Sequence, residues 1–176
     1  NSSDLFISEY VEGSGNNEAL EIYNPTSIAV DLSSYIIIRY SNGATSSAYA
    51  IQLVGTILPN DVHVGVLEKL NPAGTGQELP VADSLQAKAD EFYCPVYATN
   101  STWYWNGNDA IVLARGSVNE ISDAIIVDVF GKIGEDPGSG WIPDSSLSCV
   151  GSQYSWTEDH TLIRKSTVLS GDIEPL

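Results

Sequence analysis

The chain has 176 residues, of which 43% are hydrophobic, and a formal net charge of −16 from 23 acidic and 7 basic residues. This length is enough for one hydrophobic core, and no apolar run approaches the roughly 20 residues of a membrane-spanning helix. An acidic surface repels phosphate backbones, because nucleic-acid binding draws on lysine and arginine contacts to phosphate. The composition therefore argues against both a membrane span and a nucleic-acid partner.

The segment from Asp4 to Tyr40 carries the clearest secondary-structure pattern. Two alternating segments, LFISEYV and EALEIY, flank the linker EGSGNN, whose glycine and asparagine residues tolerate the positive φ of a tight reversal. Asn24-Pro25-Thr26 then ends the second strand, because proline lacks a ladder donor. We predict strands at residues 5–11, 18–23, 35–41, 49–54, 61–67, 92–97, 110–115, 124–130 and 161–165.

Helical periodicity occurs in VADSLQAKADEF, near residues 81–92, and predicts a short helix across one end of a β-sandwich. The irregular segments at 71–91 and 131–159 exceed the usual length of a connection, and such segments are often functional. The second one contains two tryptophans and a cysteine, which favours a packed loop.

Five blocks in this order resemble the lamin-tail domain family in its bacterial secreted form: ISEYVEGSGNNEALEIYNP, VDLSSY, WNGNDAIVLA, IIVDVFG and TLIRKSTV. The resemblance spans residues 4–170 and is weakest at 60–100, where we expect an insertion. It implies an all-β fold, an immunoglobulin-like antiparallel β-sandwich with long inserted loops, in a single domain over residues 1–176. Relatives usually continue after the RKSTV block into a further strand, so we expect the final strand to be absent here or supplied differently.

Charged residues in the predicted strands share a face with apolar residues. Strand alternation places Glu9 and Arg39 on core faces, and an unpaired buried charge costs several kcal/mol, so we predict that they form an ion pair. Asp128 shares a face with apolar residues of IIVDVFG, and we predict that it accepts a hydrogen bond from Arg164 or Lys165. Both interpretations are structural, and a catalytic role is the alternative.

Acidic loops offer the oxygen ligands that a hard cation prefers. The segment EDPGSGWIPD contains Glu135, Asp136 and Asp144, and the hairpin turn at 12–18 contributes two glutamates and two asparagines. Neither segment matches the spacing of an EF-hand. The hairpin is the weaker candidate, because relatives commonly carry a lysine in place of Glu18. Calcium at Glu135, Asp136 and Asp144 is thus an expectation, with merely solvated acidic turns as the alternative.

Trp103, Tyr104 and Trp105 form an aromatic cluster ahead of the turn NGND. Exposed, they would stack on a sugar ring or an extended peptide, whereas in relatives such an element is structural. Cys94 and Cys149 are the two cysteines of the chain, and such a pair in an exported protein usually forms a disulfide. Closing this loop stabilises by about 4 kcal/mol in the chain-entropy description, and two buried free thiols are the alternative.

The resemblance implies a non-catalytic accessory module of a bacterial protein, located outside the cell, at its surface or in the periplasm. Its expected role is protein contact, adhesion or the positioning of a catalytic neighbour, and we expect a monomer that binds a protein or surface ligand. Nucleophile motifs such as G-x-S-x-G do not occur, so the sequence does not predict an enzyme. The alternatives are a carbohydrate-binding module using the aromatic cluster at 103–105 and a calcium-dependent hydrolase using the acidic loops.

Overall fold

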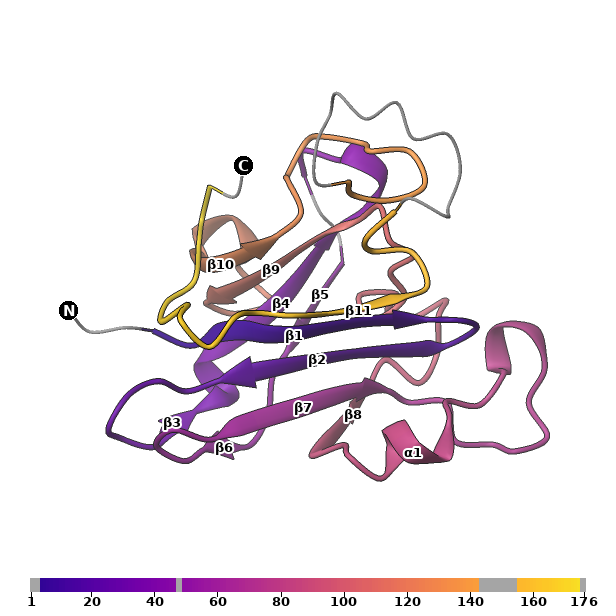
Figure 1. Cartoon of the computed structure of the whole chain (residues 1–176), viewed down its shortest axis with the longest axis horizontal. Helices are drawn as coiled ribbons and strands as arrows, with labels where there is room; N and C mark the ends of the chain where they lie inside the picture. Colours follow the sequence, from indigo (N-terminus) through magenta and orange to yellow (C-terminus); the bar gives the residue numbers. More distant parts are fainter. Residues whose placement is uncertain (1–3, 47–48, 143–154, 175–176) are drawn as a thin grey trace.

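Two β-sheets packed face to face form the body of the protein, which a computed structural model describes over residues 4–46, 49–142 and 155–174 (Figure 1). The larger sheet has five strands in the order β11-β1-β2-β7-β8, and the smaller sheet has four in the order β10-β9-β4-β5. The strands of the five-stranded sheet are β1 (Phe6–Gly13), β2 (Asn17–Tyr23), β7 (Val62–Leu67), β8 (Glu91–Tyr93) and β11 (His160–Ile163). Those of the four-stranded sheet are β4 (Tyr35–Tyr40), β5 (Tyr49–Gln52), β9 (Ala110–Arg115) and β10 (Ile125–Phe130).

The remaining elements are short. A two-stranded sheet pairs β3 (Val30–Asp31) with β6 (Thr56–Ile57), and the strand pairs between described residues are antiparallel apart from β7 with β8. One α-helix, α1 (Asp83–Gln86), and four 3-10 helices lie in the described connections, the latter at Leu32–Ser34, Ser41–Gly43, Gly76–Glu78 and Ile121–Asp123. None of the helices in the described ranges is long and apolar enough to cross a membrane. The predicted all-β, immunoglobulin-like sandwich is confirmed.

The β1–β2 hairpin forms where the sequence predicts it. Gly15 occupies the turn with φ of 79°, in the left-handed region that favours glycine. Asn24, fully buried, ends β2: its amide nitrogen donates to the carbonyl oxygens of Ile28, Ile57 and Leu58, and its side-chain oxygen accepts from Thr26. One asparagine thus satisfies backbone groups of two loops at the end of the strand.

The core between the sheets is apolar and rich in aromatic side chains. Its largest fully buried members are Trp103 and Trp105, from the segment before β9. Tyr10 of β1 stacks on Phe130 of β10 with ring centroids 4.0 Å apart, which joins the two sheets directly. A second apolar cluster covers the other face of the four-stranded sheet, so this sheet is buried on both faces.

Two β-bulges change which side chains face the core. In β1 the register shifts between Ile7 and Glu9, so Ile7 and Tyr10 both face the core and Glu9 faces outward. In β10 the shift lies between Ile126 and Asp128, which turns Asp128 into the interior between the sheets. A strict two-residue alternation cannot predict either change, because each bulge inserts one residue into the strand.

Each predicted strand overlaps an observed strand, but several boundaries and the helix differ. The strand expected at 92–97 is β8, which ends at Tyr93, and the helix expected at 81–92 is the single turn α1. The helix is short because Asp90 joins the β-sheet: its backbone N–H donates to Val64 O, and its carboxylate accepts from Val64 N. The expected last strand at 161–165 is β11, which pairs with β1.

Candidate binding site

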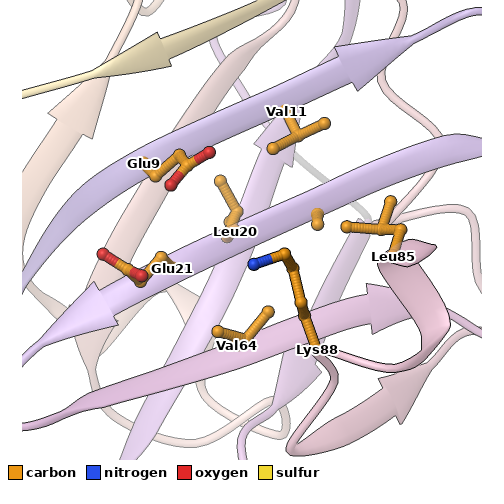
Figure 2. A pocket seen from close by; sticks show the side chains of 8 residues that line it. Glu9, Val11, Leu20, Glu21, Val64, Leu85 and Lys88 are labelled. Atoms are coloured by element: carbon orange, nitrogen blue, oxygen red, sulfur yellow. The ribbon is translucent and has the colours of Figure 1, made fainter.

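A pocket of about 280 Å³ lies on the outer face of the five-stranded sheet, between β1, β2, β7 and the segment around α1 (Figure 2). Its floor is apolar and its rim is charged. The charged side chains are Glu9, Glu21 and Lys88, and the apolar lining comes from Val11, Ala19, Leu20, Val64 and Leu85.

Strand register sets the positions of these side chains. Glu9 of β1 pairs with Glu21 of β2, which in turn pairs with Val64 of β7, so the three side chains form one row across the sheet. Val11 and Ala19 pair in the next row on the same face. The hairpin register places Glu9 in this row, and the bulge between Ile7 and Glu9 lets Ile7 face the core while Glu9 faces outward.

The hairpin turn holds the segment that forms the far wall of the pocket. Asn16 donates from its amide to the carbonyl oxygens of Gln77 and Leu79, and Asn17 accepts a hydrogen bond from the N–H of Ala82. These bonds fix the chain just before α1. Leu85 of α1 and Lys88, two residues after it, reach the pocket from there. Figure 2 shows the Lys88 ammonium pointing toward the side on which Glu9 and Glu21 lie.

The pocket carries two carboxylates and one ammonium. Partial burial raises the pKa of Glu9, the neighbouring Glu21 raises it further, and Lys88 opposes both effects. Glu21 accepts a 2.7 Å hydrogen bond from the Ser8 hydroxyl. The ion pairs between described residues do not include Glu9, Glu21 or Lys88. The site therefore keeps an excess negative charge beside an apolar floor.

A second acidic feature, the buried carboxyl pair of Glu12 and Glu18, lies at the turn end of the same hairpin. These two residues pair across β1 and β2 on the core-facing side and are only 7% and 4% exposed. Burial raises the pKa of Glu12 to about 7, and burial together with Glu12 raises the pKa of Glu18 to about 9. Glu12 accepts a hydrogen bond from the N–H of Asp159, whereas Oε2 of Glu18 is buried without a hydrogen-bond partner among the described residues.

The predicted ion pair between Glu9 and Arg39 is wrong. Arg39 faces the core from β4 and is buried as expected, but its partner is Asp109, with Nη1 3.6 Å from Oδ2. It also donates to the carbonyl oxygen of Tyr104 and to the hydroxyl of Ser101. The bulge in β1 explains the error, because it directs Glu9 to the opposite face of its sheet.

The predicted contact between Asp128 and the last strand region is present. Nη2 of Arg164 lies 2.8 Å from Oδ1 of Asp128, which is fully buried. Asp128 also accepts hydrogen bonds from the backbone N–H groups of Ile7, Val129 and Asp172. This carboxylate joins β1, β10 and the chain after β11, and its engagement by these donors favours the structural interpretation over catalysis.

The interpretation of Trp103, Tyr104 and Trp105 as an exposed stacking platform is wrong. The two indoles are buried within the core, where Trp103 stacks on Tyr93 with centroids 4.5 Å apart. Tyr104 is half-buried and donates to the carbonyl oxygen of Cys94. The carbohydrate-binding alternative therefore loses the aromatic surface on which it depended.

The structure describes two members of the predicted calcium loop. Glu135 forms an ion pair with Lys132 at 2.8 Å, Asp136 accepts from the N–H of Gly138, and Asp144 lies outside the described residues. Across the described ranges, no group of three or more histidine, cysteine, aspartate or glutamate side chains is placed to hold a metal ion. Calcium at this loop stays a prediction.

The cysteines and histidines show no catalytic arrangement in the part of the chain that the structure describes. Burial raises the pKa of the Cys94 thiol to about 11. Cys94 forms no disulfide with a described residue, and Cys149 lies outside the described residues, so the predicted disulfide stays a prediction. His63 is buried and hydrogen-bonded to the Tyr93 hydroxyl at 3.0 Å, and burial lowers its pKa. His160 is exposed at the start of β11.

The pocket combines residues that the sequence analysis considered separately or not at all. Glu21, Val64, Leu85 and Lys88 received no role, although the hairpin offered a signal. A turn centred on Gly15 pairs residues equidistant from it, which places Glu9 opposite Glu21. The part that α1 plays in the pocket depends on long-range contacts with the hairpin, which the local sequence around α1 does not indicate.

These features define an immunoglobulin-like β-sandwich module with a small pocket on one outer face. The profile of the lamin tail domain family matches residues 1–128, and the chain belongs to this family. The domains of this family are in general non-enzymatic modules. A comparison with curated proteins found no match.

Proposed function

We propose that this domain is a non-catalytic accessory module that contacts a partner protein through the outer face of its five-stranded sheet. The observation that carries the proposal is the pocket beside α1, with an apolar floor and an unbalanced pair of carboxylates. An apolar surface with a few placed polar groups is typical of a binding site. The net charge of −16 supports a basic partner, because it accelerates encounter with positively charged surfaces.

The setting of this contact belongs to the same proposal. We place the module outside the cell, at its surface or in the periplasm, acting as a monomer that positions a neighbouring catalytic domain or mediates adhesion. The hydrolase alternative receives no support from Glu135, because Lys132 already neutralises this carboxylate. A binding role needs no catalytic carboxylate, and the residues that line the pocket are sufficient for binding.

In-cell photo-crosslinking tests the proposed contact face. A photoreactive amino acid replaces Ala87, which is exposed beside Lys88, and in a matched control it replaces Ser122, exposed on the 3-10 helix Ile121–Asp123. We expect a discrete crosslinked protein adduct from position 87 and none from position 122, in cells that produce the full protein. Adducts from position 122 alone, or from neither position, would refute the proposed contact face.

A further inference from the structure

We propose that the pocket of Glu9, Glu21 and Lys88 binds the side chain of one lysine or arginine of the partner protein. This inference rests on the proposed function and specifies the chemistry of its contact. Three properties of the site carry it: the charge of its rim, the apolar character of its floor and the exposure of its own cation, Lys88.

The first property is an unbalanced charge. Glu9 and Glu21 are directly opposed on neighbouring strands, an arrangement in which like charges repel. Lys88 neutralises one charge at most, and its ammonium forms no ion pair within 4 Å of a described carboxylate. A second cation between the two carboxylates would remove the repulsion and gain charge-assisted hydrogen bonds.

The second property is a floor that suits an alkyl stem. Val11, Ala19, Val64 and Leu85 line the pocket next to the two carboxylates. Lysine and arginine place their methylene groups on apolar surface while the charged end reaches polar groups. A volume of about 280 Å³ lies just below the range of roughly 300–1,000 Å³ for small-molecule pockets, which suits one long side chain rather than a larger ligand.

The third property is that the exposed Lys88 side chain can move its ammonium away from the two carboxylates. Its side chain is exposed, and the segment after α1 holds it through the backbone alone among the described contacts. Exposed lysine side chains exchange rotamers rapidly, so an incoming guanidinium or ammonium can replace the Lys88 ammonium beside Glu21. The site therefore selects a cation over a neutral side chain of the same length.

A titration followed by two-dimensional ¹⁵N NMR tests this inference on the folded chain. The probes are the N-acetyl, N′-methylamide derivatives of lysine, arginine and norleucine, and norleucine is the neutral analogue of lysine. We expect the lysine and arginine probes to shift amide signals of β1, β2 and β7, with millimolar affinity that weakens as salt is added. In the double variant Glu9→Gln, Glu21→Gln the affinity should fall about tenfold.

The matched control removes the same charge away from the pocket. In Glu120→Gln, Asp123→Asn both substituted residues are exposed near the four-stranded sheet, and the affinity should stay within a factor of two of the wild-type value. Equal binding of the norleucine probe, an equal loss in the control variant, or shifts outside the pocket would each overturn the inference. A position-87 crosslink that persists in the Glu9→Gln, Glu21→Gln variant would refute this inference and leave the proposed function standing. If position 87 gives no crosslink even with Glu9 and Glu21 unchanged, the proposed function itself is refuted.

Discussion

Replacing Glu18 by glutamine should stabilise the protein at alkaline pH. Glu18 is 4% exposed, faces Glu12 across the hairpin, and has a pKa of about 9 in the folded state, against an ordinary value of 4.5. Between these two values the folded chain holds a proton that the unfolded chain has released. The free energy of unfolding therefore falls as pH rises from about 4.5 and levels off only above about 9.

The size of the effect follows from the shift. At about 1.4 kcal/mol per pH unit, retaining this proton at pH 8 costs on the order of 5 kcal/mol relative to the unfolded chain. Arg39 lowers the pKa of Glu18, but this effect is smaller than the rise caused by burial and by Glu12. Glutamine has the same shape and no proton to release, so Glu18→Gln should gain several kcal/mol over wild type at pH 8 and little at pH 5.

Urea denaturation of wild type and Glu18→Gln at pH 5, 6, 7, 8 and 9 measures this difference. The exposed Glu120→Gln serves as the control and should follow the wild-type curve at every pH. A residual slope between pH 5 and 7 is expected in Glu18→Gln, because Glu12 titrates at about 7. Parallel curves for wild type and Glu18→Gln across the whole range would refute the reasoning, since they would mean that Glu18 is not a proton-binding site of the folded state.

Three further changes test other contacts. Arg164→Gln should destabilise the fold by about 2 kcal/mol in thermal unfolding, because the fully buried Asp128 loses its ion pair. As a control, Arg115→Gln removes the cation of an exposed ion pair and should cost less than about 1 kcal/mol. Asn24→Ala removes the amide that donates to three loop carbonyls, and the free energy of unfolding measured by urea denaturation should fall by about 2–4 kcal/mol. A fall below about 1 kcal/mol would contradict the role of Asn24 at the end of β2. Millimolar calcium should raise the melting temperature by several degrees over an EDTA-treated sample if the 135–144 loop binds it, and an unchanged value would reject that site.

Local pattern was sufficient to predict most of the fold. Alternation and turn residues located the β1–β2 hairpin. The end of β2 near Asn24 was predicted from the proline that follows this residue. The very short strands β3 and β6 escaped prediction, because two residues carry no periodicity. The helix was overestimated because Asp90 is drawn into the sheet by hydrogen bonds to a distant strand.

Side-chain partners were harder to predict than strands. The contact between Asp128 and Arg164 was found because both residues lie in strongly patterned segments. The partner of Arg39 was missed because one inserted residue in β1 reverses the face of Glu9, and sequence alone does not show a bulge. For the aromatic residues before β9 the sequence left a structural role and an exposed binding role both open, because composition reveals stacking capacity, whereas exposure depends on the whole fold.

The pairing of β11 with β1 has a consequence for the order of folding. β1 begins at Phe6, yet its outer neighbour starts only at His160, so the edge of β1 cannot be covered until the residues up to Ile163 have left the ribosome. Contacts between residues this far apart in sequence close late and slow the overall rate. During synthesis the N–H and C=O groups along β1 stay open to strands of other chains, which exposes a nascent molecule to aggregation at this edge.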